Sequence, residues 1–211
     1  MSANGRASLP EKSVALINPN RLQPGIAPIA LEYLASELEH KGIEVRILDL
    51  CHARKPLDVI RAFVQDFDPD VIGITIRNLD DVVYDCFLAG EMKYLVDAIK
   101  QASDAPIVLG GSGFSMAPNL LLDYYGADLG IRGEGEEALP MLLEGEFFDV
   151  PGLVYRDGDV IAMNPLGHVD VNALHLAKRG RLDYPSYAYK AGSKGGAGVQ
   201  TKRGCPNKCI Y

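Results

Sequence analysis

Two cysteines near the end of the sequence have a spacing that could hold a metal. The last seven residues are Cys205-Pro-Asn-Lys-Cys209-Ile-Tyr211, so three residues separate the two thiols. A C-x3-C-x2-C pattern, typical of an iron–sulfur signature, would place its third cysteine at the next position. Two cysteines alone also occur as half of a zinc site, as a disulfide or without a shared role. The choice among these depends on the elements that precede them.

The composition is that of a globular protein with one sizeable core. Of 211 residues, 47% are hydrophobic and 23% are charged. No apolar stretch is long enough to cross a membrane, and residues 1–13 lack the apolar core of a signal peptide. Four cysteines without a dense framework agree with a reducing compartment, where a cysteine cluster favours metal or redox chemistry. We therefore expect a cytoplasmic protein without a membrane partner.

The charge argues against nucleic acid as a partner. The net charge is −7, whereas a protein that binds phosphate backbones needs a basic face. The basic residues gather late in the chain, at Lys178, Arg179, Arg181, Lys190, Lys194, Lys202, Arg203 and Lys208. This cluster is typical of a solvated linker, or of the surface of a truncated barrel.

Five short apolar runs alternate with segments of helical period. The runs are Val14–Asn18, Val45–Leu48, Val71–Ile76, Ile107–Leu109 and Leu129–Arg132. They are nearly continuous in Val, Ile and Leu, as in strands covered on both faces. The helical segments are marked by Leu31–Leu38 after Pro28, Leu57–Phe67 after Pro56, Met92–Ile99, Leu121–Tyr125 and Glu136–Leu143. The sequence thus predicts an α/β fold with a doubly wound, five-stranded parallel sheet in the flavodoxin-like order 2-1-3-4-5.

The pattern changes after Gly145. Two short apolar segments flank Asp157-Gly158, which predicts a β-hairpin with a tight turn. Little periodicity follows, up to a glycine-rich stretch that ends at Gly198. We divide the chain into a disordered leader (1–13), an α/β domain (14–147), a hairpin and linker (148–198), and the start of a second domain (199–211).

Four loops at the carboxyl ends of the predicted strands have unusual compositions. Each one alone is most simply a turn, but an open parallel sheet binds its ligand at this edge. Glycines there let the backbone approach a ligand and supply free N–H groups. A G-x-G-x-x-G fingerprint after the first strand and a Walker lysine are both absent from the sequence, which disfavours a dinucleotide or nucleotide hydrolysis. The loops together predict a large, flat ligand, with the candidates Asn18, Arg21, Gly25, Arg77, Asn78, Gly110, Gly111, Ser112, Gly113, Gly133, Glu134, Gly135 and Glu136.

These elements resemble, over essentially the whole chain, the cobalamin-binding domain at the N-terminus of radical S-adenosylmethionine enzymes. The segments that carry the resemblance are Asn18-Pro19, Pro28–Ala35, Asp70–Thr75, Pro106–Gly111, Asp128–Glu137, Pro151–Tyr155 and Thr201–Cys209. The Gly133-Glu-Gly-Glu136 box and the later Arg203-Gly-Cys-Pro206 segment are specific when they occur in this order. The resemblance implies a Rossmann-like domain that holds cobalamin on its strand ends and faces a barrel of the same chain.

The resemblance also implies the chemistry of the two thiols. Cys205 and Cys209 map onto the first two ligands of a 4Fe–4S cluster, and Tyr211 maps onto an aromatic position near the adenine of S-adenosylmethionine. An external electron donor would reduce the cluster. The parent protein would be a radical enzyme, for instance a methyltransferase, while residues 1–211 alone are expected to be inactive.

The lower face of cobalt has no evident histidine ligand. Many domains of this kind use a D-x-H-x-x-G motif, which the sequence does not contain; its closest approach, Asp49-Leu-Cys-His52, has another spacing. We predict that Arg77 or Asn78 meets this face, because their loop lies at the switch point of the sheet. For Arg77, an ion pair with Asp80 or Asp81 is an equal alternative.

Two other functional classes stay open from the sequence alone. One is a flavodoxin-like module that binds a small ligand and has the fold without cobalamin. The other is a standalone fold with a C-terminal zinc half-site. For Cys51 and Cys86 we expect buried, inert thiols. Glu136 and Glu137 suit the first turn of a helix as well as a ligand.

Overall fold

A computed structural model describes residues 12–81, 86–87, 89–145, 147–187, 198–204 and 207. Its main sheet has seven strands in the order β2-β1-β3-β6-β7-β8-β9, and β4 and β5 pair separately. The strands are β1 (Ser13–Asn18), β2 (Glu44–Asp49), β3 (Val71–Thr75), β4 (Asp80–Asp81), β5 (Cys86–Phe87), β6 (Ile107–Gly110), β7 (Leu129–Ile131), β8 (Leu153–Asp157) and β9 (Val160–Met163). The first five strands of the main sheet are parallel, in the predicted order 2-1-3-4-5.

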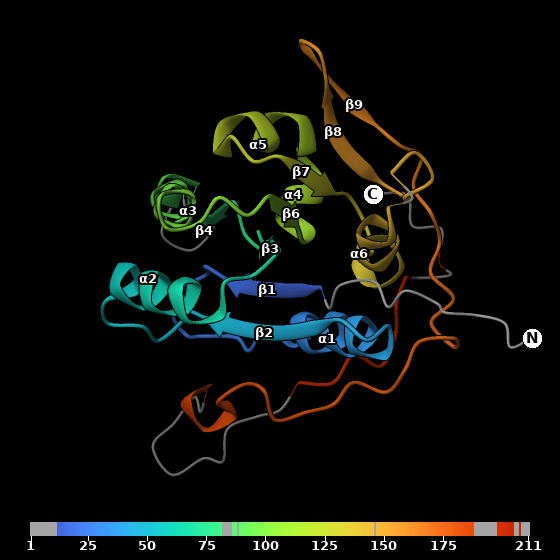
Figure 1. The fold of residues 1–211 in the computed structure, drawn as a ribbon. Coiled ribbons are helices and arrows are strands. Elements are labelled where there is room, and N and C mark those ends of the chain that lie inside the picture. The colour runs from blue at the N-terminus through green and yellow to red at the C-terminus, as the bar shows by residue number, and fades with distance from the viewer. Residues whose placement is uncertain are drawn as a thin grey trace, which may run out of the picture.

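Helices cover both faces of the sheet, so that the fold is doubly wound as predicted. Helices α1 and α6 lie on one face, and α2, α3 and α5 lie on the other (Figure 1). The helices are α1 (Ile29–His40), α2 (Pro56–Phe67), α3 (Ala89–Ala102), α4 (Ser112–Met116), α5 (Pro118–Tyr125) and α6 (Gly135–Glu144), with a short 3-10 turn at Tyr184–Tyr187. Proline opens α2 and α5, where a missing N–H is tolerated.

Strand β1 shows why the predicted strands are continuously apolar. Val14 and Leu16 point into the core under α1 and α6, while Ala15 and Ile17 point into the core under α2, α3 and α5. All four side chains are at most 1% exposed, because each face of the sheet is covered. Alternation of polar and apolar residues is therefore lost, as is typical of a central parallel strand.

The predicted hairpin is confirmed, and the structure adds where it goes. Residues Asp157 and Val160 pair across the turn, in which Gly158 has a φ of +59°. Strand β8 then pairs antiparallel with β7, so that the hairpin extends the five parallel strands into a mixed sheet. The sequence also gave no sign of α4 or of the small β4–β5 ladder.

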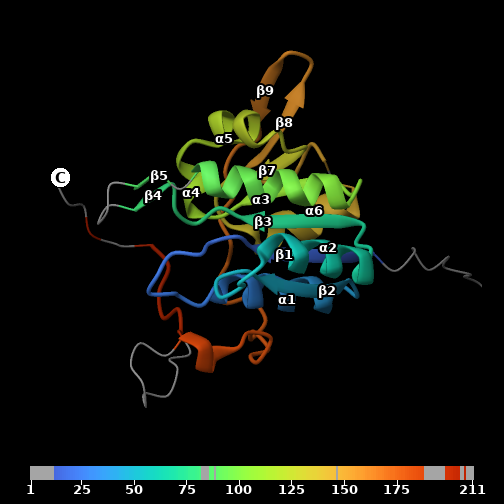
Figure 2. The ribbon, with the colours of Figure 1, turned by 90° about the vertical axis from the view of Figure 1, so that its left-hand side faces the viewer.

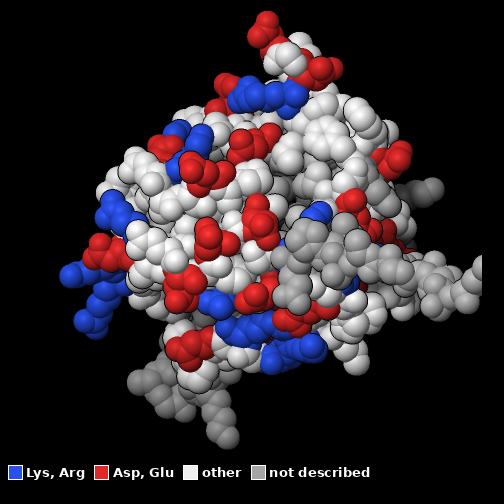
Figure 3. Space-filling model, in the orientation of Figure 1, with Lys and Arg blue, Asp and Glu red and all other residues white. Residues whose placement is uncertain are grey.

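Residues 164–187 pass along α1, and we call this segment the strap. The sequence predicted a solvated linker for its basic residues, and Lys178 and Arg179 are indeed exposed, but three of these residues also form ion pairs with α1. Lys178 and Arg181 pair with Glu39, and Arg179 pairs with Glu32. Acidic and basic side chains are accordingly interleaved over α1 (Figure 3). Among the described helices, the longest apolar segments fall short of what a bilayer crossing requires.

Candidate functional site

The carboxyl ends of the parallel strands meet at one edge of the sheet. Thr75 at the end of β3 pairs with Gly110 at the end of β6, and Asn18 at the end of β1 pairs with Asp49 of β2. The loop after β1, the β4–β5 ladder and α4 all lie at this end of the molecule (Figure 2). The loops that the sequence singled out therefore share the edge where open α/β sheets bind ligands.

Asn18 is a buried link between strands. Asn18 is only 3% exposed, and its Nδ2 donates a hydrogen bond to Asp49 Oδ1 at 2.8 Å. Its Oδ1 accepts from the backbone N–H of Asn20, and Asn20 Nδ2 donates to Asn78 Oδ1 at 3.1 Å. The loops after β1 and β3 are thus joined at the switch point, with Asn18 beneath the surface and Asn78 half-buried. The sequence did not single out Asn20, which makes the connection.

Arg21 and Gly25 are engaged by the protein itself. Arg21 donates to the carbonyl of Ala53 at 3.1 Å and forms an ion pair with Glu91 at 3.2 Å. A Cβ on Gly25 would lie 2.8 Å from Cys51 Sγ, so this glycine allows close packing of its loop on the loop after β2. Both residues support the edge through these contacts.

The glycines after β6 let that strand's end approach β3 closely. Gly111 has a φ of +96°, and a Cβ there would lie 2.7 Å from both the Ile76 carbonyl oxygen and Thr75 Oγ1. The prediction that this glycine-rich loop offers free N–H groups is wrong for Gly113, because the N–H of Gly113 donates to the Ile76 carbonyl at 2.9 Å. The contact itself requires glycine, since a left-handed φ and a short approach coincide at Gly111.

Arg77 has an anchored backbone and an exposed side chain. Its carbonyl accepts a hydrogen bond from Ser112 Oγ at 3.0 Å, and Ser112 is also exposed. Gly110 is half-buried between them and β7. The side chains of Asp80 and Asp81 lie outside the described groups, so the alternative ion pair of Arg77 stays a prediction. Arg77 and Ser112 are the predicted residues that present polar side chains at the open edge.

The Gly133-Glu-Gly-Glu136 box binds a later part of the chain. Gly133, with a φ of +93°, donates its N–H to Ser115 Oγ, and α6 begins at Gly135. The guanidinium of Arg203 forms ion pairs with Glu134 at 3.1 Å and with Glu136. Burial lowers the pKa of Arg203, but the hydrogen bonds and charges of Glu136 and Glu134 outweigh it and raise that pKa above its usual value.

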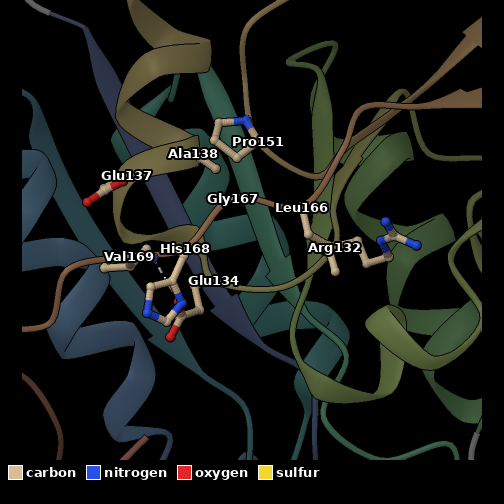
Figure 4. A pocket seen from close by; sticks show the side chains of 9 residues that line it. All are labelled: Arg132, Glu134, Glu137, Ala138, Pro151, Leu166, Gly167, His168 and Val169. Carbon is tan, nitrogen blue, oxygen red and sulfur yellow. Dashed lines mark hydrogen bonds between the residues drawn. The ribbon is translucent and has the colours of Figure 1, made fainter. Parts of the chain in front are cut away.

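A small cavity lies beside this box. It has a volume of about 10 Å³, room for roughly one water molecule. Figure 4 shows Glu134 and His168 on one side of it, while the side chain of Arg132 points away from them. Arg132 follows β7, and its Nε is buried without a hydrogen-bond partner among the described residues. Arg132 belongs to the Asp128–Glu137 segment but was not among the predicted ligands.

The predicted metal ligands Cys205 and Cys209, and Tyr211, lie outside the described residues. Within the described ranges, no three His, Cys, Asp or Glu side chains are close enough together to hold a metal. Cys51 is buried, as expected of an inert thiol. Burial raises its pKa above the usual value, which keeps the thiol protonated.

The residues at the edge fit a large corrin ring better than a small enclosed ligand. The backbone there is built from glycines, and Arg77, Ser112 and Gly133 are exposed on the loops after β3, β6 and β7. Their exposure leaves hydrogen-bonding groups accessible at this edge. Three of the described histidines are engaged elsewhere, since His52 packs edge-on against the Tyr187 ring at 4.7 Å and His40 stacks on His175 at 3.5 Å.

Known proteins share this domain. Residues 22–143 match the B12 binding domain family. The chain is 38% identical over 157 residues to a tryptophan 2-C-methyltransferase of Streptomyces laurentii. This match covers 69% of the chain and 26% of that protein. It is 28% identical over 193 residues to a hopanoid C-3 methylase of Methylococcus capsulatus, covering 88% of the chain and 35% of that protein.

Solved structures agree with these matches. The radical S-adenosylmethionine methyltransferase TsrM from Kitasatospora setae, solved with cobalamin and a 4Fe–4S cluster, superposes with a TM-score of 0.69 at 34% identity. That match covers 74% of this chain and 31% of TsrM. OxsB, solved with aqua-cobalamin and S-adenosylmethionine, shares the fold with a TM-score of 0.60 at 20% identity.

The chain spans between about a quarter and a half of each curated relative, from 26% to 47% of their lengths. The family match, residues 22–143, lies within the α/β domain. The chain belongs to the B12 binding domain family, and it is a cobalamin-binding domain that resembles those of radical S-adenosylmethionine methyltransferases.

Proposed function

We propose that this chain is the cobalamin-binding portion of a longer radical S-adenosylmethionine enzyme that transfers methyl groups. The observation that carries the proposal is the open edge, where Arg77 and Ser112 are exposed over a glycine backbone. At the same edge, Arg203 forms an ion pair with Glu134, and Arg203 comes two residues before Cys205 in the sequence. This contact supports the proposal, because Arg203 precedes the predicted cluster ligand Cys205 by two residues and lies against the predicted cofactor edge.

Each group at the edge has a distinct task in this proposal. The loops after β3, β6 and β7 would hold the corrin ring, and Ser112 and backbone groups there would bind its amides. Arg77 would lie toward cobalt as a cation that does not ligate it, which would disfavour a tightly held ligand on that side. Asn18, Asn20 and Asn78 keep the switch point rigid through their hydrogen bonds.

The second half of the proposal concerns the residues after Gly204. Cys205 and Cys209 supply two thiolates to a 4Fe–4S cluster, and Tyr211 lies near the adenine of S-adenosylmethionine. When bound, cobalamin supplies a redox-active cobalt for methyl transfer, and the cluster supplies the electron that cleaves S-adenosylmethionine. A barrel of the same chain and an external electron donor complete the system. Residues 1–211 hold two of the three thiolates of the pattern and are expected to have no turnover alone.

Corrinoid absorption tests the first half. Purified residues 1–211 are mixed with hydroxocobalamin, the excess is removed, and retained corrinoid bands are expected. Arg77→Ala should weaken retention and shift the bands, whereas Arg61→Ala, an exposed arginine within α2, should change neither. Unchanged affinity and spectrum in Arg77→Ala would overturn the role of Arg77. Absence of any retained corrinoid, in this chain and in the full-length parent, would overturn the cobalamin proposal.

A further inference from the structure

Arg203 bridges two glutamates that lie far from it in the sequence. Arg203 NH1 is 3.1 Å from Glu134 Oε1, and NH2 contacts Glu136 Oε1. The third guanidinium nitrogen, Nε, donates to Gln200 Oε1 at 3.0 Å. The side chains of Arg203 and Glu136 are only 18% and 10% exposed, so the contact is largely shielded from solvent. We call these three residues the arginine clamp (Arg203, Glu134 and Glu136).

The geometry of the clamp depends on arginine. The two carboxylates sit two positions apart around the start of α6, and each one takes a different terminal nitrogen of the planar guanidinium. A lysine ammonium is a single point charge and cannot span both in this way. Glu134 is held in turn, because its Oε2 accepts the backbone N–H of Val169 at 3.2 Å. The clamp therefore fixes both the position and the orientation of the Arg203 side chain.

The chain just before the clamp is tied at two further points. Arg179 NH2 donates to the carbonyl of Gly198 at 2.8 Å, and Tyr33 Oη accepts the N–H of Gln200 at 3.4 Å. Arg179 itself is fixed on the fully buried Glu32 of α1. Residues 198–203 thus run between α1 and the start of α6, held from both helices. Since α6 begins after the carboxyl end of β7, this path leads to the edge that binds cobalamin.

We propose that Arg203 is a positioning residue, which fixes the chain up to Gly204, directly before the predicted cluster ligand Cys205, relative to the cobalamin edge. This inference rests on the proposed function, because it assigns the cluster to Cys205 and Cys209. Arg203 touches neither cofactor in the proposal and acts through the backbone that leads to Gly204. Glu134 and Glu136, which sequence analysis assigned to cofactor binding, serve as its fixed partners.

The test uses the full-length parent, reconstituted with iron, sulfide and hydroxocobalamin. The variants are Arg203→Gln, Arg203→Lys, Glu136→Gln and the double variant Arg203→Gln/Glu136→Gln, with Lys202→Gln as a control at the neighbouring exposed cation. The first readout is the iron and corrinoid content. The second is the distance distribution between cobalt and the reduced cluster, measured by pulsed electron paramagnetic resonance. The third is hydrogen exchange of the amides of residues 199–204.

The expected result separates positioning from binding. Arg203→Gln and Glu136→Gln retain both cofactors, but the cobalt–cluster distance distribution broadens. Exchange of the amides of residues 199–204 becomes roughly tenfold faster, since a charge-assisted pair holds them. Arg203→Lys recovers only part of the effect, the double variant is no worse than either single one, and Lys202→Gln matches the wild type.

Two different outcomes overturn the two claims separately. Wild type without bound corrinoid or without a cluster contradicts the proposed function. Wild type with both cofactors, together with an unchanged distance distribution in Arg203→Gln and Glu136→Gln, contradicts the positioning role alone. Should Arg203→Gln not fold, Glu136→Gln decides the question, because it keeps the size of the side chain and removes only its charge.

Discussion

Arg179 of the strap lies against the buried carboxylate of Glu32 in α1, with Arg179 Nε 3.1 Å from Glu32 Oε2. Glu32 is completely buried, and its Oε1 accepts the backbone N–H groups of Gly180 and Arg181 at 3.1 Å each. The hydroxyl of Tyr184 donates to Oε2 as well. A charge without water is tolerated here because every side of it meets a donor. Glu32 is therefore the point that holds the strap on the domain.

Replacing Glu32 should loosen the strap and destabilise the fold. Glu32→Gln keeps the volume but removes the charge that four donors share, and we expect a loss of roughly 1.5–3 kcal/mol. Glu39→Gln is the matched control, because Glu39 is 25% exposed, whereas Glu32 is fully buried. That change should cost under about 1 kcal/mol. Urea unfolding of residues 1–211 measures both, and equal losses would contradict the special role of Glu32.

Removing the hydroxyl of Tyr125 should stabilise the fold. Its side chain is fully buried, and its Oη has no hydrogen-bond partner among the described residues. Tyr125→Phe removes an unsatisfied polar atom, so the free energy of unfolding at pH 8 should rise by about 1 kcal/mol. Tyr184→Phe deletes the same atom from a tyrosine bonded to Glu32 and should lower it by a similar amount. A loss of stability in Tyr125→Phe would show that its hydroxyl has a partner after all.

The same two tyrosines predict a loss of stability in alkali. Burial, with the nearby Tyr124, raises the pKa of Tyr125 to about 12, and burial together with Glu32 raises the pKa of Tyr184 to about 12. Unfolded tyrosine has a pKa near its ordinary value of 10, so the two groups leave the free energy of unfolding independent of pH below pH 10 and lower it as pH rises to about 12. Each phenylalanine variant should reduce this slope, by at most about 1.4 kcal/mol per pH unit. Urea unfolding at several pH values between 9 and 12 checks it; parallel slopes would contradict the prediction.

Gly111 should not tolerate a side chain. Gly111→Ala places a Cβ 2.7 Å from the Ile76 carbonyl at a φ of +96°, and should cost at least about 1–3 kcal/mol through strain and displacement. Gly90→Ala is the control, since nothing lies within 4 Å of its Cβ at the start of α3. There the change should be neutral or stabilise by about 0.5–1 kcal/mol. Thermal unfolding compares the two, and a similar midpoint for both would rule out the close approach of β3 and Gly111.

The central strands were predictable because burial leaves a mark in the sequence. Val71–Thr75 is apolar at nearly every position, and a strand with a helix layer on each face allows little else. The handedness of the connections predicted a parallel, doubly wound sheet, and the number of strands predicted its flavodoxin-like order. Helix α4 was missed because its glycines are read as a turn, while its first N–H groups bond to the distant Ile76 carbonyl. Such tertiary bonds have no local pattern.

The contacts of the strap and of the arginine clamp could not be predicted from the sequence for the same reason. Glu32 lies within the apolar stripe of Leu31 and Ala35. A carboxylate at such a position indicates a buried partner, but the sequence does not say which cation pairs with it. Arg203 and Glu136 are 67 positions apart, and both were singled out for reasons unrelated to each other. Motif spacing therefore identified the right segments, and the contact between them needed the fold.

The antiparallel hairpin after β7 has a consequence for how the domain behaves at high concentration. Without β8, the short strand β7 would expose a row of unpaired backbone groups that another copy could join as an added strand. Strand β9, which replaces it at the border, has only four residues and follows a turn flanked by Asp157 and Asp159. The opposite border, β2, carries Glu44, Arg46 and Asp49. Both borders of the sheet thus discourage intermolecular strand pairing and protect the domain against aggregation.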